Sequence, residues 1–282
     1  MTGRLRRRTA LLPRGWMLTA AAIVGVALYL FPIYWMFVSS LKNSAEIFVN
    51  PPTLFPRQPS LAAFESVFVR ENVLRYLRNS LSIALPVTLL TMVMGAIGGY
   101  ALSRLKSRFV DAALFIVLML QVFPDALLAT PMFIIFKFLG LLNTFAAVIL
   151  ATTSKTLAFA LVILRPMFRQ VPIELEEASL VDGCNRFQAF VRIVLPIMHI
   201  PLIVVGALSF VQAYGQFVYA LTLLSRQELQ PATVGIYSFV GAEYADWNRV
   251  MAFSSVFVLP ILVLFLILQR RIVAGLTAGA LK

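Results

Sequence analysis

Two ionisable residues, Asp125 and Lys155, lie well inside long apolar segments of this 282-residue chain. A charge in such a segment is costly unless it is paired or faces water, so each is a candidate for a functional site. If the two segments form an antiparallel hairpin that turns near residue 140, each residue lies fifteen residues from the turn. At about 1.5 Å per residue this is roughly 22 Å, so both reach a similar depth. The pattern predicts an ion pair, which is either purely architectural or part of a passage for a polar solute.

A stripe of polar side chains follows in a later apolar segment. Gln212, Gln216 and Tyr219 are three or four residues apart and would share one helix face, with Tyr214 and Gln121 as outlying polar groups. Sugar sites commonly combine amide hydrogen bonds with aromatic faces, so the stripe could line a passage for a sugar. Polar residues that only hold helices together would give the same pattern.

Residues 174–184 form a polar island between apolar runs and hold four of the chain's twelve carboxylates. Pro172 suits a first helical position, and the glutamates after it would lie near the positive end of the helix dipole. Gly183 is expected to end this helix, because glycine reverses the backbone at little cost. Asn185 can cap a second helix that runs to Pro196. The pattern predicts a short helix, a sharp turn and a second helix, all outside the bilayer.

Six apolar segments are long enough to cross a bilayer, which predicts an all-α, multi-pass membrane protein with a single transmembrane domain, residues 16–282. Pro124 and Pro131 should interrupt the third span, and Gly95 and Gly99 form a G-x-x-x-G pair suited to close helix packing within the chain. The first segment is too long for a signal peptide, so it should be retained. The expected spans are 16–38, 79–102, 110–138, 144–164, 196–224 and 250–268.

The distribution of basic residues gives the orientation. Fifteen of the 24 lie in the N-terminal residues 1–15, the turn after the second span, the region of the polar island and the C-terminal tail. The positive-inside rule therefore places both termini and the polar island in the cytoplasm. The formal net charge of +12 would suggest nucleic-acid binding in a soluble protein, but in a chain that is 60% hydrophobic, topology and anionic membrane lipid explain it better.

The outer side should carry residues 39–78 and a polar segment, residues 225–248. Aromatic side chains in an exposed polar segment commonly face a partner protein. The aromatic residues of this second segment are Tyr237, Phe239, Tyr244 and Trp247.

The composition argues against an enzyme. A single cysteine, Cys184, and a single histidine, His199, exclude an intramolecular disulfide and a metal site built from such residues. No phosphate-binding loop G-x-x-x-x-G-K-[ST] occurs, so any ATP would be bound by another chain. We therefore expect no catalytic residue, no metal and no cofactor in this chain.

The polar island resembles the cytoplasmic signature of binding-protein-dependent ABC importer permeases, E-A-A-x-x-D-G-A, then F and a later L-P. Ser179 and Cys184 stand where alanine is usual, and both are small. The resemblance implies that residues 172–195 hold a coupling helix, between the fourth and fifth spans, that seats in a groove of the ATPase subunit. The positions that match, or stand in for alanine, are Glu177, Ala178, Ser179, Asp182, Gly183, Cys184, Phe190, Leu195 and Pro196. The contact with the ATPase is assigned to Glu177, Ala178, Ser179, Asp182, Gly183 and Phe190.

Other segments resemble the carbohydrate-uptake permeases within that family. These are Asn79-Ser80, Tyr100–Arg104 and the tail Gln269–Lys282, and they suggest the shorter permease of maltose-type and glycerol-phosphate-type importers. Where many relatives have Trp-Asn-Glu, this chain has Tyr214-Gly215-Gln216. The resemblance implies the cytoplasmic (inner) membrane and a complex with a second permease, two ATPase copies that bind ATP and Mg, and an extracytoplasmic binding protein.

Two classes of function follow. The first is a permease subunit of an ATP-driven importer for a carbohydrate or a related polar solute, without covalent chemistry of its own. The second is a stand-alone secondary transporter driven by an ion gradient, which would use Asp125 as its ion or proton site and need no ATPase. Neighbouring genes for an ATPase and a binding protein would separate the two.

Overall fold

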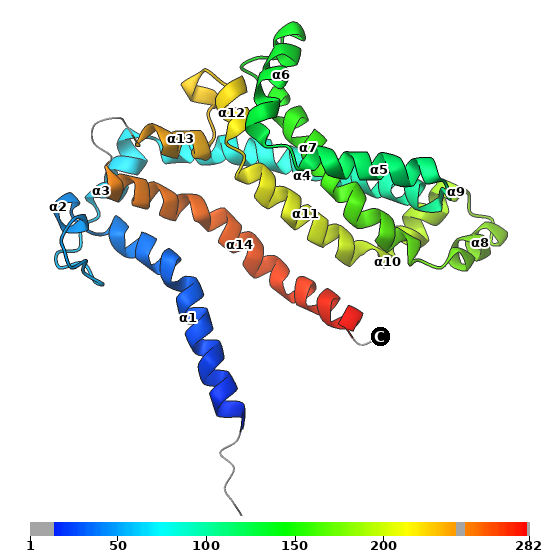
Figure 1. The fold of residues 1–282 in the computed structure, drawn as a ribbon, viewed down its shortest axis with the longest axis horizontal. Helices are drawn as coiled ribbons and strands as arrows, with labels where there is room; N and C mark the ends of the chain where they lie inside the picture. The colour runs from blue at the N-terminus through cyan, green and yellow to red at the C-terminus, as the bar shows by residue number, and fades with distance from the viewer. Residues whose placement is uncertain (1–13, 241–245, 281–282) are drawn as a thin grey trace, which may run out of the picture.

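The centre of the fold is a pair of long helices, α4 (Val73–Arg104) and α7 (Phe145–Arg169), which lie side by side (Figure 1). A computed structural model describes residues 14–240 and 246–280, and every regular element in these two ranges is helical. The other elements are α1 (Arg14–Ser40), α2 (Ser44–Ile47), α3 (Ala62–Glu65), η1 (Ser66–Arg70), α5 (Arg108–Gln121), α6 (Asp125–Phe138), α8 (Ile173–Val181), α9 (Arg186–Ala189), η2 (Phe190–Val194), α10 (Leu195–Ile197), α11 (His199–Tyr214), α12 (Val218–Leu223), η3 (Gln227–Leu229), α13 (Ala232–Ser238) and α14 (Trp247–Ala280).

The glycine pair of α4 makes the close approach to α7 possible. A Cβ atom added to Gly95 would lie 3.1 Å from Ala160 Cβ, and one added to Gly99 would lie 3.1 Å from Leu164 Cβ. Larger side chains at these two positions would push the helices apart. The prediction that this motif packs helices within the chain is confirmed.

Among the described residues, four helices are long and apolar enough to cross a membrane, which confirms an all-helical, multi-pass protein. They are Trp16–Ser40, Val73–Arg104, Phe145–Arg169 and Trp247–Arg270. Three of the predicted spans lie inside α1, α4 and α14, and the fourth predicted span begins at Thr144, which caps α7 by accepting a hydrogen bond from the backbone N–H of Ala147. These four apolar segments therefore fold as the sequence predicts.

The predicted third span is not one helix. It divides into α5 and α6, each of 14 residues, which are separated by residues 122–124. Pro124 lacks a backbone N–H and directly precedes α6, as expected at a helix start. Pro131, in contrast, lies inside α6 without ending it, so this predicted interruption is wrong. Fourteen helical residues cover about 21 Å, which is less than the roughly 30 Å of a bilayer core.

The predicted fifth span, residues 196–224, is also interrupted. Helical residues Arg186–Ile197 meet α11 at an angle of 77°, so Pro196 lies before the bend and does not open the span. At its other end α11 stops at Gly215, and the chain starts again as α12, which points in a different direction (Figure 1). The structure therefore has up to five candidate spans by helix length, against six predicted.

The C-terminal end of α1 and the N-terminal ends of α4 and α14 lie near one another, with α2, α3 and η1 beside them (Figure 1). Glu46 of α2 orders the connecting segment, since its Oε1 accepts hydrogen bonds from Arg57 N at 2.9 Å and Thr53 Oγ1 at 2.8 Å. The backbone hydrogen bond from Arg57 lowers the pKa of this carboxyl group. The contribution of these bonds to stability is therefore present above the ordinary pKa of glutamate and is lost as the pH falls through the lowered value.

Candidate functional site

The polar island folds as the sequence predicts. Helix α8 follows Pro172 and ends at Asp182, and Gly183 then adopts a positive φ of 89°. Asn185 begins α9 with a capping box, in which its side chain accepts from Gln188 N at 2.8 Å and its N–H donates to Gln188 Oε1 at 2.9 Å. The predicted helix, turn and second helix are confirmed.

Helix α8 is held against the protein by a buried carboxylate. Glu176 is 8% exposed and accepts a hydrogen bond from Tyr100 Oη at 2.7 Å and one from Arg104 Nε at 3.0 Å. The Arg104 guanidinium also donates to the backbone oxygens of Phe168 at 3.1 Å and Val171 at 3.3 Å. The Arg104 side chain thus joins the C-terminal end of α4 to the C-terminal end of α7 and to α8.

Sequence reasoning missed this anchor. It counted Glu176 with the other acids of the island and Arg104 with the basic residues that mark topology. A signal was present, because Tyr100 and Arg104 are one helical turn apart at the end of a span and offer two donors to a carboxylate beyond the membrane.

Two of the six residues assigned to the ATPase contact, Ser179 and Phe190, are buried within this chain. Phe190 packs under α8 against Tyr100, with ring centroids 4.7 Å apart, and lies 6.5 Å from the ring of Phe168. Ser179 is also buried, and its Oγ donates to Glu176 O at 2.7 Å. These residues position α8, because the aromatic cluster and the short hydroxyl side chain fill the space beneath it.

The other four predicted contact residues form the outward side of the island. Three large apolar side chains of α8, Ile173, Leu175 and Val181, are also exposed, and Val181 is 87% exposed. Exposed apolar side chains that are rimmed by polar residues mark protein interaction sites. The four exposed contact residues are Glu177, Ala178, Asp182 and Gly183.

A second candidate site lies where the chain is broken between α5 and α6 and between α11 and α12. It is a polar cavity of about 350 Å³. Its lining comes from both of these breaks and from the middle of α7. A helix break leaves backbone polar groups without helical hydrogen-bond partners, and these groups favour polar neighbours. The lining residues are Gln121, Asp125, Thr152, Lys155, Thr156, Phe159, Gln212, Gly215 and Gln216.

The predicted ion pair is present in this cavity. Lys155 Nζ lies 2.5 Å from Asp125 Oδ1, and the two side chains are 34% and 19% exposed. Tyr219 Oη lies 3.4 Å from Oδ1, Gln216 Nε2 lies 3.5 Å from Oδ2, and Gln121 Nε2 lies 3.4 Å from Lys155 O. The aspartate is thus reached from two segments that are distant from it in the sequence, α7 and residues 216–219.

The predicted polar face of the fifth span is wrong as a face of one helix. Gln212 belongs to α11, Gln216 to the break and Tyr219 to α12. The break at Gly215 nonetheless turns Gln216 and Tyr219 towards Asp125. Their convergence therefore comes from the chain reversal and not from helical periodicity.

Tyr214 does not line the cavity. It is 1% exposed, its ring stacks on Phe257 at a centroid distance of 4.7 Å, and its Oη donates to Phe257 O at 3.1 Å. Thr152 does line it and was not predicted. Its Oγ1 is buried without a hydrogen-bond partner among the described residues, and the signal for it was its position three residues before Lys155 on the same face of α7.

Comparisons with known proteins show the family of this chain. Residues 89–277 match the family described as "Binding-protein-dependent transport system inner membrane component". The sulfoquinovosyl glycerol transport system permease protein SmoH of Agrobacterium fabrum is 36% identical over 90% of this chain and 89% of its own length. The diacetylchitobiose uptake system permease protein DasC of Streptomyces coelicolor is 32% identical over 98% of this chain and 99% of its own.

A solved structure has the same fold. It is a bacterial ABC transporter involved in the import of the acidic polysaccharide alginate, and one of its chains superposes with a TM-score of 0.76 at 20% sequence identity. The match covers 91% of this chain and 96% of the other. The similarity therefore extends over nearly the whole fold.

Proposed function

This chain belongs to the binding-protein-dependent ABC importer permeases, and we propose that it forms one half of the passage for a carbohydrate across the inner membrane. It is a multi-pass transmembrane subunit and not an enzyme. Membership of this family decides against the alternative of a stand-alone transporter driven by an ion gradient. The remaining half of the passage belongs to a second permease, and two ATPase copies bind ATP and Mg.

The observation that carries this proposal is the anchored α8. Its outward side is acidic and apolar, and its inward side is bound through Glu176 to Arg104. A force applied by the ATPase to this outward side is therefore passed directly to the inner ends of α4 and α7. We propose six spans, of which α5 with α6 form the third and α11 with α12 the fifth, and both termini in the cytoplasm.

The polar cavity supports a carbohydrate as the solute. Its amide groups, its threonine hydroxyls and its ion pair supply both donors and acceptors, as the hydroxyl groups of a sugar require. The unpartnered Oγ1 of Thr152 gains a hydrogen bond when such a molecule passes. The names of several similar permeases state sugars or sugar derivatives as their solutes, including trehalose for SugB of Mycobacterium tuberculosis.

We expect Glu177→Lys and Gly183→Pro each to abolish solute uptake while the chain still inserts into the membrane. Charge reversal places a lysine where the ATPase groove accepts an acid, and proline cannot adopt the positive φ of Gly183. The measurement is ATP-dependent uptake together with co-purification of the ATPase. Glu228→Lys, the same charge change on exposed outer residue 228, is the control and should retain the ATPase. Normal uptake by both variants would remove α8 from the coupling route.

The outer aromatic segment should face the binding protein through Tyr237. This side chain is exposed, whereas Phe239 packs on Phe253 with ring centroids 5.4 Å apart, and Tyr244 lies outside the described residues. A photo-crosslinker at position 237 is expected to capture the solute-loaded binding protein, and one at position 253 should not. Failure to capture it from position 237 would contradict this assignment.

A further inference from the structure

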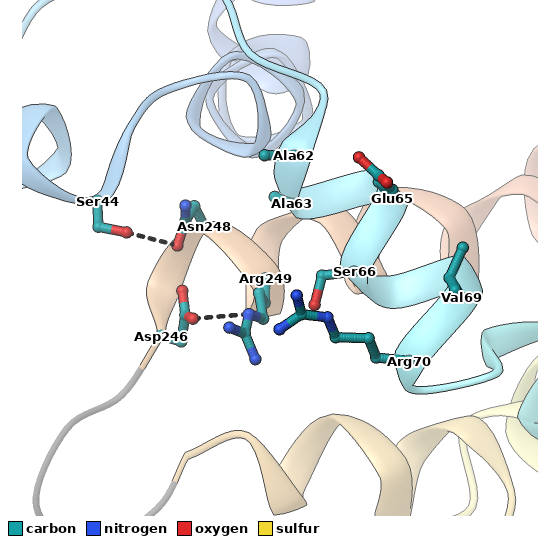
Figure 2. A pocket seen from close by; sticks show the side chains of 10 residues that line it. All are labelled: Ser44, Ala62, Ala63, Glu65, Ser66, Val69, Arg70, Asp246, Asn248 and Arg249. Atoms are coloured by element: carbon teal, nitrogen blue, oxygen red, sulfur yellow. Dashed lines mark hydrogen bonds and ion pairs between the residues drawn. The ribbon is translucent and has the colours of Figure 1, made fainter.

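A pocket at the outer end of the protein differs from both sites described above. It has a volume of about 320 Å³ and lies between α2, the turn formed by α3 and η1, and the start of α14 (Figure 2). Ser44 Oγ donates to Asn248 Oδ1 at 3.2 Å, which ties α2 to the first turn of α14 and closes one side of the pocket. The pocket is therefore built by three segments that are distant in the sequence.

The pocket contains more hydrogen-bond donors than acceptors. Figure 2 shows the guanidinium groups of Arg70 and Arg249 turned into the same space, and Glu65 turned away from them. Asp246 Oδ2 lies 2.8 Å from Nε of Arg249, which leaves the two terminal nitrogens of that side chain available. Among the described residues, no carboxylate forms an ion pair with Arg70.

Two buried oxygens in the pocket also lack partners within the described part of the chain. The first is Oγ of Ser66, which lies with Arg70 in the π-helical turn η1. Turns of π-helix are rare in proteins, and those that occur are often found at functional sites. The second is Oδ1 of Asp246, which requires a donor. An occupant that complements the pocket must therefore bring an anionic oxygen for the arginines and an N–H group for Asp246.

We propose that this pocket receives an acidic side chain, with its adjoining backbone N–H, from the solute-binding protein of the importer. The proposal rests on the proposed function, which supplies the partner. A carboxylate matches the fork of donors on a guanidinium, and a protein loop carries an amide next to it. The exposed apolar side chains of Leu61 and Val69 lie beside the pocket and provide the surface that protein interfaces place around such an anchor.

The location of the pocket fits this partner. It lies beside the outer start of α4, whereas the coupling helix contacts the inner end of this 32-residue helix. At about 1.5 Å per residue, the two sites are separated by roughly 48 Å. An ATPase that docks on α8 cannot reach the pocket, and a protein delivered from the outer side can.

The test is a titration of the reconstituted importer with its solute-loaded binding protein, read as stimulated ATPase activity. Arg70→Glu is expected to raise the concentration for half-maximal stimulation at least 10-fold, with the maximal rate and subunit assembly unchanged. Arg70→Lys should raise this half-maximal concentration several-fold, because lysine keeps the positive charge but loses the planar set of guanidinium donors. Arg57→Glu, the same charge change on an exposed residue outside the pocket, is the control and should titrate like the wild type.

The outcomes separate the proposal from its premise. A wild-type importer that no binding protein stimulates would refute the proposed function, whereas normal stimulation with an unchanged titration for Arg70→Glu would overturn the pocket assignment alone. The half-maximal concentration for Arg70→Glu could also rise in nanodiscs of phosphatidylethanolamine and phosphatidylglycerol but not in nanodiscs of phosphatidylcholine. This result would assign the pocket to a lipid headgroup and would also overturn the proposal. A binding-protein variant with lysine in place of the matching acid should restore the affinity between the binding protein and the Arg70→Glu importer.

Discussion

Arg104→Ala is expected to abolish stimulation of the ATPase by the loaded binding protein while the chain remains in the membrane. The substitution removes the charged partner of Glu176 and the donors to Phe168 O and Val171 O. Loss of one partner of a largely buried ion pair costs about 3–5 kcal/mol, because the other charge remains without compensation. Helix α8 is then no longer held to α4, and movement of the ATPase is not transmitted.

The comparison variants separate loss of the anchor from general damage. Arg104→Lys keeps the positive charge but loses the several donors of the planar guanidinium, and it should retain part of the stimulation. Tyr100→Phe removes a single hydrogen bond to Glu176 and should lower the stability of the protein by about 1 kcal/mol. Arg108→Ala removes an exposed basic residue from the same turn and should behave as the wild type. Full stimulation of the ATPase in the Arg104→Ala importer would show that α8 transmits movement by another route.

Asp125→Asn and Lys155→Gln are each expected to reduce uptake more than the double substitution does. Each single change leaves one partly buried charge without its partner, and the double change leaves none. We expect a loss of at least 10-fold for each single variant, measured as the initial rate of solute uptake per assembled complex. Lys137→Gln, at an exposed lysine of the same helix α6, is the control and should have little effect.

Exchange of the two residues distinguishes an architectural pair from a contact with the solute. The variant Asp125→Lys with Lys155→Asp should recover much of the uptake that either single change removes, if the pair serves the packing of α6 against α7. If Asp125 itself contacts the solute, the exchanged protein should assemble normally and remain inactive. Wild-type uptake by both single variants would show that neither charge is buried in the assembled importer.

The sequence by itself determined the parts of this protein that depend on neighbours within a few residues. Pro172, Gly183 and Asn185 delimit the short helices of the polar island, because capping and positive φ are local properties. Apolar runs predicted four long helices correctly, since burial in lipid requires only length and composition. The pairing of Asp125 with Lys155 followed from counting residues to a shared turn.

Only the tertiary structure decided which side of each element faces the rest of the protein. Glu176 and Glu177 are adjacent and chemically equal, yet Glu176 turns inward because Arg104, 72 residues earlier, ends beside it. Gln216 and Tyr219 reach Asp125 because the helix stops at Gly215, while Tyr214 packs in the core against Phe257. Residue periodicity describes one regular helix, and it carries no information about where that helix breaks or which distant segment packs against it.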